Sequence, residues 1–231
     1  QIIYLGGILP KGEPEEEWSQ HLKSRLEVEK TLSTGTAALT AFRASIIVGP
    51  GGSSFDMIKN LVKKLPVMVC PKWTESKTQP ISLSDTLTII DSCLGNESVY
   101  DQAIEIGNPE VMSYKEMLIR TSVVMGKKRF IFSVPFFSPG LSKLWVGYFG
   151  ESPSQLVSPL VESLKHTMTV SDELSFKAAD ISYQSYDEAV KIALEAKKEP
   201  DLPKFKLLKT QKNTVRSIQR MPNLRGKSAF W

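Results

Sequence analysis

The sequence has few of the residues that hold a disulfide scaffold or a metal centre together. Its 231 residues include two cysteines, Cys70 and Cys93, and two histidines, His21 and His166. Neither histidine has cysteines or carboxylates nearby at the spacing of zinc ligands. We therefore predict no metal site and no disulfide framework. Two reduced thiols fit a cytoplasmic location.

Phosphate-binding motifs are missing as well. No G-x-G-x-x-G occurs, and the stretch Gly49-Pro-Gly-Gly-Ser-Ser54 has neither that spacing nor the acidic residue that follows it. No G-x-S-x-G occurs either. The chain opens directly on an apolar strand at Gln1, without Met or a signal peptide. We expect a start inside a domain, with any pyrophosphate site in a preceding segment.

The chain also has no run of about 20 consecutive apolar residues, the length that a membrane helix needs. Residues 130–149 contain seven aromatic residues, but Pro135, Pro139 and Lys143 interrupt them. This segment favours a hydrophobic pocket wall or a packed subdomain over a peripheral membrane surface.

Charge is distributed unevenly along the chain. The net charge is +4, yet Leu202–Trp231 carries eight Lys and Arg residues and no acidic one. Such a segment favours a solvated extension over a nucleic-acid site, because aromatic residues are not regularly interleaved with the basic ones and no helix-turn-helix surrounds it. We predict a main domain at 1–198, followed at 199–231 by a basic tail or a linker to a further domain, and no nucleic-acid partner.

Predicted strands and helices alternate along the chain, which is typical of a parallel α/β sheet. The predicted strands are 2–5, 38–48, 67–70 and 102–106. The predicted helices are 14–32, 53–64, 84–93, 113–124, 155–164 and 186–196. Ser53 or Ser54 and Ser84-Asp85 are predicted helix caps, and Ser113 with Glu116 forms a capping box.

The order of these pieces resembles the later part of the extended short-chain dehydrogenase/reductase superfamily, which includes sugar epimerases and NmrA-like proteins. The stretches that carry the resemblance are Ile2–Leu5, Leu39–Gly51, Gln79–Asp85 and Ile104–Glu116. The resemblance implies an incomplete Rossmann-like parallel sheet made of the later strands, with the small substrate-binding subdomain of these proteins.

A bacterial group of atypical NAD(P)-binding members is especially similar. It shares Tyr4–Gly7, His21–Arg25, Leu65–Val69, Leu141–Gly147 and Leu160–Leu164 with this chain. The similarity implies NAD or NADP as the cofactor and a small molecule as the substrate. In that group, Asn213–Arg220 would lead into a further C-terminal domain.

Members of the superfamily use a Ser or Thr, a Tyr and a Lys four residues after the Tyr. The matching positions hold Gly6-Gly7, His21 and Arg25. The resemblance thus implies His21 and Arg25 as catalytic residues. It implies that the cofactor is held by Gly6, Gly7, Arg25, Arg43, Ala44 and Ser45. It implies a substrate pocket formed by Trp18, Gly49, Phe55, Trp73 and Trp145.

Two functions remain open at this point. One is an NAD(P)(H)-binding reductase-like or epimerase-like protein in which His21 transfers a proton near neutral pH. The other is a catalytically silent scaffold, sensor or assembly factor, because Arg is not a conservative exchange for Lys and Gly6-Gly7 offers no hydroxyl. In the second case His21 is a half-exposed helix residue with no catalytic role.

Overall fold

The computed structural model describes residues 1–134, 166–176 and 181–196. The chain divides into two units, residues 1–196 and 197–231, of which the second lies outside the described residues. The predicted helix at 155–164, the basic tail and Trp145 also lie outside them. The predicted division at 198 stays a prediction.

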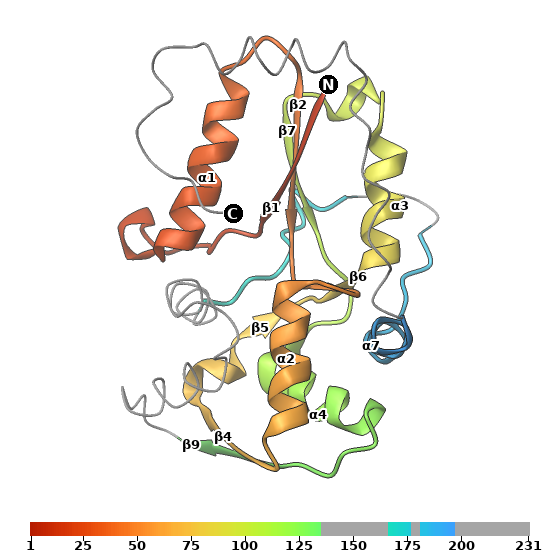
Figure 1. The fold of residues 1–231 in the computed structure, drawn as a ribbon. Helices are drawn as coiled ribbons and strands as arrows, with labels where there is room; N and C mark the ends of the chain where they lie inside the picture. Colours follow the sequence, from red (N-terminus) through yellow and green to blue (C-terminus); the bar gives the residue numbers. More distant parts are fainter. Residues whose placement is uncertain (135–165, 177–180, 197–231) are drawn as a thin grey trace, which may run out of the picture. The chain divides into compact units, whose positions relative to one another are not determined.

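A parallel sheet of three strands forms the centre of the first unit (Figure 1). Its order is β1 (Ile2–Gly7), β2 (Leu39–Ala44) and β7 (Gln102–Ile106). In register, Gly6 pairs with Arg43 and Arg43 pairs with Glu105. Because all three strands are parallel, their carboxyl ends meet at one edge of the sheet. The predicted parallel α/β class is confirmed.

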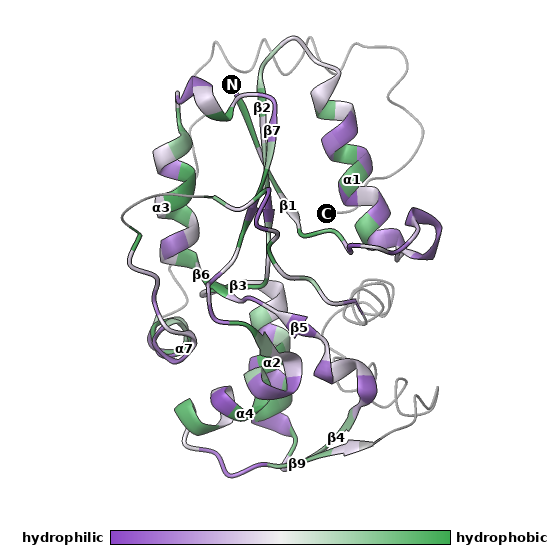
Figure 2. Cartoon of the chain, turned by 180° about the vertical axis from the view of Figure 1, so that it is seen from behind, coloured by the Kyte–Doolittle hydropathy of each residue, from purple (hydrophilic) through white to green (hydrophobic). Residues whose placement is uncertain are grey.

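Helices α1 (Gln20–Ser33) and α3 (Leu83–Cys93) flank this sheet on opposite sides (Figures 1 and 2). On the α3 side, Phe42 and Ile104 are buried with Ile89 of the helix. Hydrophobic and hydrophilic residues alternate along the helices (Figure 2), as expected for helices with one buried face. No helix in the described ranges is long and apolar enough to cross a membrane.

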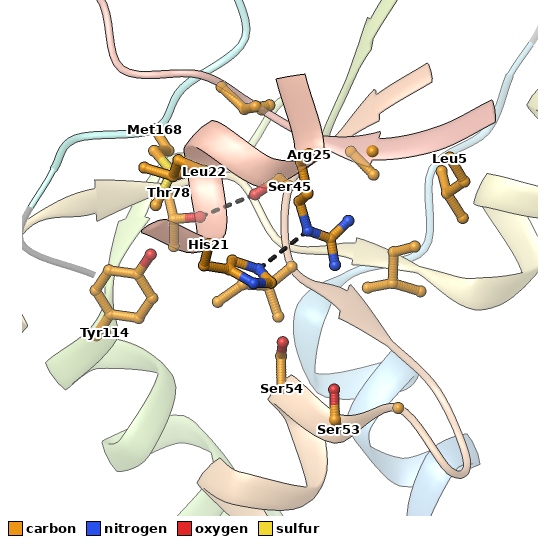
Figure 3. Close-up of a pocket in the computed structure, with 17 residues that line it drawn as sticks. Leu5, His21, Leu22, Arg25, Ser45, Ser53, Ser54, Thr78, Tyr114 and Met168 are labelled. Carbon is orange, nitrogen blue, oxygen red and sulfur yellow. Dashed lines mark hydrogen bonds between the residues drawn. The ribbon is translucent and has the colours of Figure 1, made fainter. Parts of the chain in front are cut away.

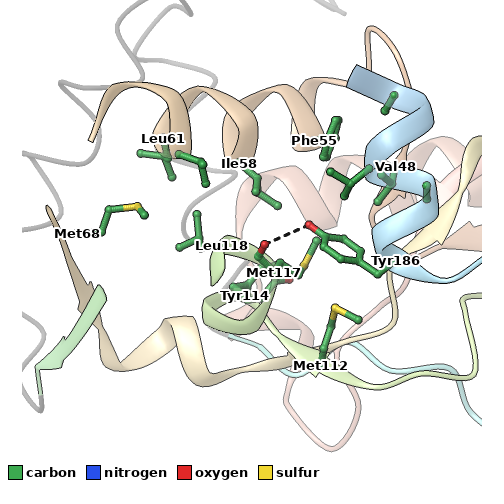
Figure 4. Close-up of a cluster of buried hydrophobic side chains, with 14 of the residues drawn as sticks. Val48, Phe55, Ile58, Leu61, Met68, Met112, Tyr114, Met117, Leu118 and Tyr186 are labelled. Carbon is green, nitrogen blue, oxygen red and sulfur yellow. Dashed lines mark hydrogen bonds between the residues drawn. The ribbon is translucent and has the colours of Figure 1, made fainter. Parts of the chain in front are cut away.

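A second group of elements packs around its own hydrophobic core (Figure 4). The helices are α2 (Ser53–Lys64), α4 (Tyr114–Val124) and α7 (Tyr186–Glu195), and the short 3-10 turn η2 (Lys72–Glu75) adds Trp73 to this core. Two further 3-10 turns, η1 (Glu15–Glu17) and η3 (Glu97–Val99), lie elsewhere in the unit. The strands form three pairs: parallel β3 (Ile47–Val48) with β6 (Ile81–Ser82), parallel β4 (Val67–Pro71) with β9 (Phe130–Val134), and antiparallel β5 (Lys77–Thr78) with β8 (Met112–Ser113). Phe55, Val62 and Val190 are fully buried among them.

The predicted strand 38–48 is wrong in one respect, since it is two strands in different sheets. Ser45 N–H donates to the Ile106 carbonyl at 3.0 Å, and the Ser45 side chain then bonds to Thr78 at 2.8 Å. The chain leaves the central sheet at this point, and Ile47 pairs with Ile81 instead. The apolar run alone does not reveal the break, because both halves are covered by other elements.

Two helix caps also differ from the prediction. Gly52, not Ser53 or Ser54, is the N-cap of α2, and Ser82, not Ser84, caps α3 by accepting from Asp85 N–H at 2.9 Å. The capping box of α4 is confirmed: Ser113 N–H donates to Glu116 at 2.6 Å and Glu116 N–H donates to Ser113 Oγ at 3.1 Å.

Candidate functional site

A cavity of about 310 Å³ opens at the carboxyl ends of β1 and β2 (Figure 3). In parallel α/β sheets this is the edge at which ligands bind. The volume is at the lower end of the range of small-molecule sites. The residues that line it are Leu5, Gly6, Gly7, Ile8, His21, Leu22, Arg25, Ala44, Ser45, Ile46, Ile47, Gly52, Ser53, Ser54, Thr78, Tyr114 and Met168.

Helix α1 brings His21 and Arg25 to this cavity on one face, one turn apart. Ser19 caps the helix by accepting from Leu22 N–H at 3.3 Å, and Leu22 and Leu26 are buried against the sheet side. Tyr4 of β1 donates from its hydroxyl to the Arg25 carbonyl at 3.1 Å. The helix is thereby fixed to β1, which sets where the His21 and Arg25 side chains lie.

Arg25 Nε donates to Nε2 of His21 at 3.0 Å. Because Nε2 accepts, the imidazole is neutral and carries its proton on Nδ1. Burial lowers the pKa of His21, and the positive charge of Arg25 lowers it further. His21 therefore enters the cavity at neutral pH as an uncharged ring with one N–H donor.

Three hydroxyl groups form another part of the cavity wall. Ser45 Oγ and Thr78 Oγ1 are hydrogen-bonded at 2.8 Å, and Gln79 N–H donates to Ser45 Oγ at 3.2 Å. Burial strongly raises the pKa of Tyr114, which is 5% exposed, and the side chain of Thr78 partly opposes that rise. Tyr114 thus stays protonated at physiological pH.

The first turn of α2 forms the remaining polar part of the wall. Gly52 caps this helix without a side-chain hydrogen bond, and Ser53 and Ser54 line the cavity with it. Figure 3 shows both serines below the side chains of His21 and Arg25. The helix N-terminus adds partial positive charge to that of Arg25.

Six of the residues predicted from the sequence lie together around this cavity: Gly6, Gly7, His21, Arg25, Ala44 and Ser45. Arg43 does not line it. Its guanidinium makes a two-bond ion pair with Glu29 of α1, with Nη2 at 2.7 Å from Oε1 and Nε at 3.1 Å from Oε2. Arg43 therefore joins β2 to α1 instead of facing a ligand.

None of the described residues that were predicted for the substrate pocket lines this cavity. Phe55 and Trp73 are part of the hydrophobic core of the second group of elements. Gly49 packs on Leu83, and a Cβ at Gly49 would lie 2.6 Å from Leu83 Cβ. Trp18 is half-buried outside the cavity lining, with no acceptor for its indole N–H among the described residues. Trp145 lies outside the described residues.

Thr78, Tyr114 and Met168 line the cavity but were not predicted from the sequence. Thr78 precedes the recognised stretch Gln79–Asp85 by one residue, and Tyr114 follows the predicted cap Ser113. The local sequence around Thr78 and Tyr114 indicated a family-like stretch and a helix start, but it did not indicate a ligand-binding site. Thr78 and Tyr114 come together through the pairing of β5 with β8, and Met168 joins them through its bridge to Thr78. Neither pairing is visible in a linear pattern.

A buried carboxylate fixes the segment that carries Met168. Glu105 of β7 is 2% exposed and accepts from Ser171 N–H at 2.7 Å and Ser171 Oγ at 3.0 Å. Lys11 Nζ lies 3.1 Å from the same carboxylate and donates to the Thr169 carbonyl at 2.7 Å. Gln79 Oε1 also accepts from Val170 N–H at 2.6 Å. The segment 168–171 is thus tied to the sheet beside the cavity.

A scan against models of known protein families finds no match, and a search of curated protein sequences finds none. Solved structures do match. A nucleoside-diphosphate-sugar epimerase from Staphylococcus aureus has a TM-score of 0.59 at 12% identity, over 82% of this chain and 64% of that one. A dTDP-4-dehydrorhamnose reductase from Clostridium acetobutylicum has a TM-score of 0.56 at 11% identity, over 84% and 65%. One from Bacillus anthracis, in complex with NADP, has 0.55 at 12% identity, also over 84% and 65%.

At these identities the comparisons establish the fold. It is the fold of extended short-chain dehydrogenase/reductase proteins, as the order of the sequence motifs predicted. The matched region spans less than two thirds of each of these structures. The chain therefore corresponds to part of such a fold.

Proposed function

We propose that this chain, which has the fold of the extended short-chain dehydrogenase/reductase proteins, forms the substrate-side half of an NAD(P)(H)-binding reductase-like protein. The observation that carries the proposal is the cavity itself. Gly6 and Gly7 of β1, His21 and Arg25 of α1, and Ser45 after β2 come together at the carboxyl edge of a parallel sheet. This is where dinucleotide-binding folds place the reacting end of their cofactor.

The cavity fits only one end of the cofactor. A volume of about 310 Å³ suits a nicotinamide ring or a small substrate, not a whole dinucleotide. No described strand–turn–helix has the glycine spacing that holds a pyrophosphate. We infer that a preceding segment of a longer polypeptide supplies it, for NAD or for NADP. The bound cofactor would supply hydride transfer.

The residues of this chain would bind the cofactor and orient the substrate. Arg25 would hold a ribose hydroxyl or a phosphate oxygen with the Nη groups that its bond to His21 leaves available. The backbone at Gly6 and Gly7 would allow close approach of the cofactor, with Ala44 and Ser45 beside its ring. His21 would present its Nδ1–H to the substrate oxygen, because Arg25 keeps the ring neutral.

A second candidate is a silent cofactor-binding scaffold, sensor or assembly factor. The lowered pKa of His21 favours it, because a ring that resists protonation is a weak source of a proton at neutral pH.

We also propose, under either function, that the protein binds a small-molecule substrate or ligand, that a further C-terminal domain follows this chain and that the protein is cytoplasmic. We propose in addition that it is a member of the atypical, NmrA-like bacterial group.

One experiment on the full-length polypeptide distinguishes the two functions. NADH and NADPH are titrated by fluorescence, and their oxidation is then followed across a panel of aldehydes and ketones. Binding together with oxidation that is lost in His21→Ala supports the reductase. Binding without oxidation supports the silent protein, and no binding of either nucleotide contradicts both.

A further inference from the structure

The hydroxyl groups of Ser45, Thr78 and Tyr114 come from three separate segments and converge on the cavity. Ser45 follows β2, Thr78 ends β5, and Tyr114 begins α4. Figure 3 shows Ser45 and Thr78 joined by their hydrogen bond, with the Tyr114 hydroxyl turned toward Thr78. All three side chains line the cavity, and Thr78 and Tyr114 are 1% and 5% exposed.

The protons of this cluster do not all have acceptors. Three hydroxyls carry three protons. The bond between Ser45 and Thr78 uses one, and Thr78 is the neighbour whose side chain lowers the pKa of Tyr114 and could accept a second. Gln79 N–H occupies a lone pair of Ser45 and supplies no acceptor. At least one proton remains, whichever way the bonds run, and it has no acceptor among the described residues.

Other buried hydroxyls in the described part of the chain are satisfied differently. Thr40 donates to the Val99 carbonyl at 2.9 Å, Thr74 to the Pro71 carbonyl at 2.8 Å and Thr86 to the Ser82 carbonyl at 2.8 Å. These are structural hydroxyls, each matched to a fixed acceptor. The cavity cluster has at least one donor more than the described residues around it accept.

Tyr186 is the sharpest comparison for Tyr114. Both are buried tyrosines at the first position of a helix, and burial raises the pKa of both. Tyr186 has the Thr121 hydroxyl at 2.8 Å and the Met117 carbonyl at 3.4 Å as partners within the core. Tyr114 has no backbone carbonyl as a partner and faces the cavity.

We propose that Ser45, Thr78 and Tyr114 form a donor site for a carbonyl oxygen of the ligand. A neutral cluster with one spare proton suits a ketone or aldehyde oxygen, since an anion would call for a charged donor. The apolar neighbours Ile8, Leu22 and Met168 suit a ligand whose carbonyl carries hydrocarbon substituents. This inference rests on the proposed function, because it places the substrate in the same cavity.

Donation from this cluster would hold and polarise the carbonyl without moving a proton off Tyr114. The raised pKa of Tyr114 makes a tyrosinate costly in this site, so the cluster is a binding group for the carbonyl and not the source of the transferred proton. The transferred proton would come from water, because a neutral His21 can donate a hydrogen bond but would become an imidazolate if it lost its Nδ1 proton.

The test uses ¹³C-carbonyl-labelled cyclohexanone and acetophenone as probes of the full-length polypeptide, with and without oxidised NAD or NADP. Isotope-edited infrared spectra report the carbonyl stretching frequency of the bound probe, which falls when the oxygen accepts a hydrogen bond. We expect Tyr114→Phe and Thr78→Val to raise that frequency and to weaken binding roughly five- to tenfold, the effect of losing one neutral hydrogen bond.

Tyr186→Phe is the matched control, since it removes a buried hydroxyl outside the cavity. It should leave the frequency and the affinity unchanged, while thermal unfolding shows whether each variant is folded. The proposal is overturned if Tyr114→Phe behaves like Tyr186→Phe in a folded protein, or if neither probe binds at millimolar concentration. Probe binding without nucleotide binding would contradict the proposed function and leave the carbonyl site standing.

Discussion

Arg25 Nε donates a hydrogen bond to His21 Nε2 at 3.0 Å, although arginine and histidine side chains can both be positively charged. The bond requires His21 to be an acceptor and hence uncharged. Arg25 stays charged because its guanidinium keeps its proton throughout the physiological range. The pair is thus a cation that holds a neutral imidazole in a fixed orientation, with Nδ1–H as its one donor.

Removing the charge of Arg25 should raise the pKa of His21. In Arg25→Met the Coulombic contribution disappears, while the larger contribution of burial remains, so the pKa should move only part of the way toward 6.5. NMR titration of the imidazole resonances measures the shift. Arg43→Met is the control, since Arg43 is paired with Glu29 and does not line the cavity. An unchanged His21 titration in Arg25→Met would show that the two side chains do not interact.

The lowered pKa of His21 also predicts how stability depends on pH. In the unfolded chain His21 binds a proton near pH 6.5, whereas in the folded protein it does so only at lower pH. The unfolded state therefore binds more protons in this window, and the free energy of unfolding falls as pH drops below about 6.5. Urea denaturation between pH 5.5 and 7.5 measures the slope, which should be shallower in His21→Gln. Equal slopes would contradict the prediction.

Patterns of local sequence predicted most of the elements but not every boundary. The Ser113–Glu116 capping box and the strand Gln102–Ile106 were located because their signals are contained within a few residues. The break at Ser45 was missed, since Ser45 leaves the sheet to bond with Thr78, 33 residues away. A contact of that length leaves no mark in hydrophobic periodicity.

The candidate site was predicted where it follows the order of strands and helices. Gly7 and His21 were identified from the resemblance, which fixes the end of one strand and the face of the next helix. Tyr114 was missed because it reaches the cavity only through the packing of the second group of elements. Trp73 was assigned to the substrate pocket from the resemblance, whereas it packs against Tyr114 with ring centroids 6.4 Å apart.

Glu105→Gln should destabilise the fold more than loss of a surface charge. The Glu105 carboxylate is buried, lies 3.1 Å from Lys11 and accepts two hydrogen bonds from Ser171. Loss of its charge leaves Lys11 without that partner and weakens both bonds, at a cost of about 1–3 kcal/mol in the free energy of unfolding. Urea denaturation measures the cost, and hydrogen exchange at the Ser171 amide should become faster.

Glu110→Gln provides the comparison for that variant. Glu110 pairs with Arg120 near the surface and is itself largely exposed, so its loss should cost about 1 kcal/mol or less. If both variants lose the same stability, or if exchange at Ser171 is unaffected, Glu105 does not fix the segment 168–171.

Substitution by alanine should destabilise the fold at Gly49 but leave its stability almost unchanged at Gly7. At Gly49 a Cβ would lie 2.6 Å from Leu83 Cβ, so Gly49→Ala forces the backbone apart and should cost about 1–3 kcal/mol in the free energy of unfolding. A Cβ added at Gly7 would lie 3.8 Å from Arg25 Cδ and 3.9 Å from the Ala44 carbonyl oxygen, which are ordinary van der Waals contacts. Gly7→Ala should therefore fold normally, with a change in stability of about 0.5 kcal/mol or less.

The same substitution at Gly7 should nevertheless weaken NAD(P)H binding. The added methyl group would stand at the wall of the cavity, where the proposed function requires close approach of the cofactor to the backbone. Fluorescence titration of the full-length polypeptide measures the affinity, and thermal unfolding confirms that Gly7→Ala is folded. Unchanged affinity in the folded variant would show that the end of β1 does not approach the cofactor. Weaker binding at undiminished stability would separate the role of Gly7 in the site from any role in the fold.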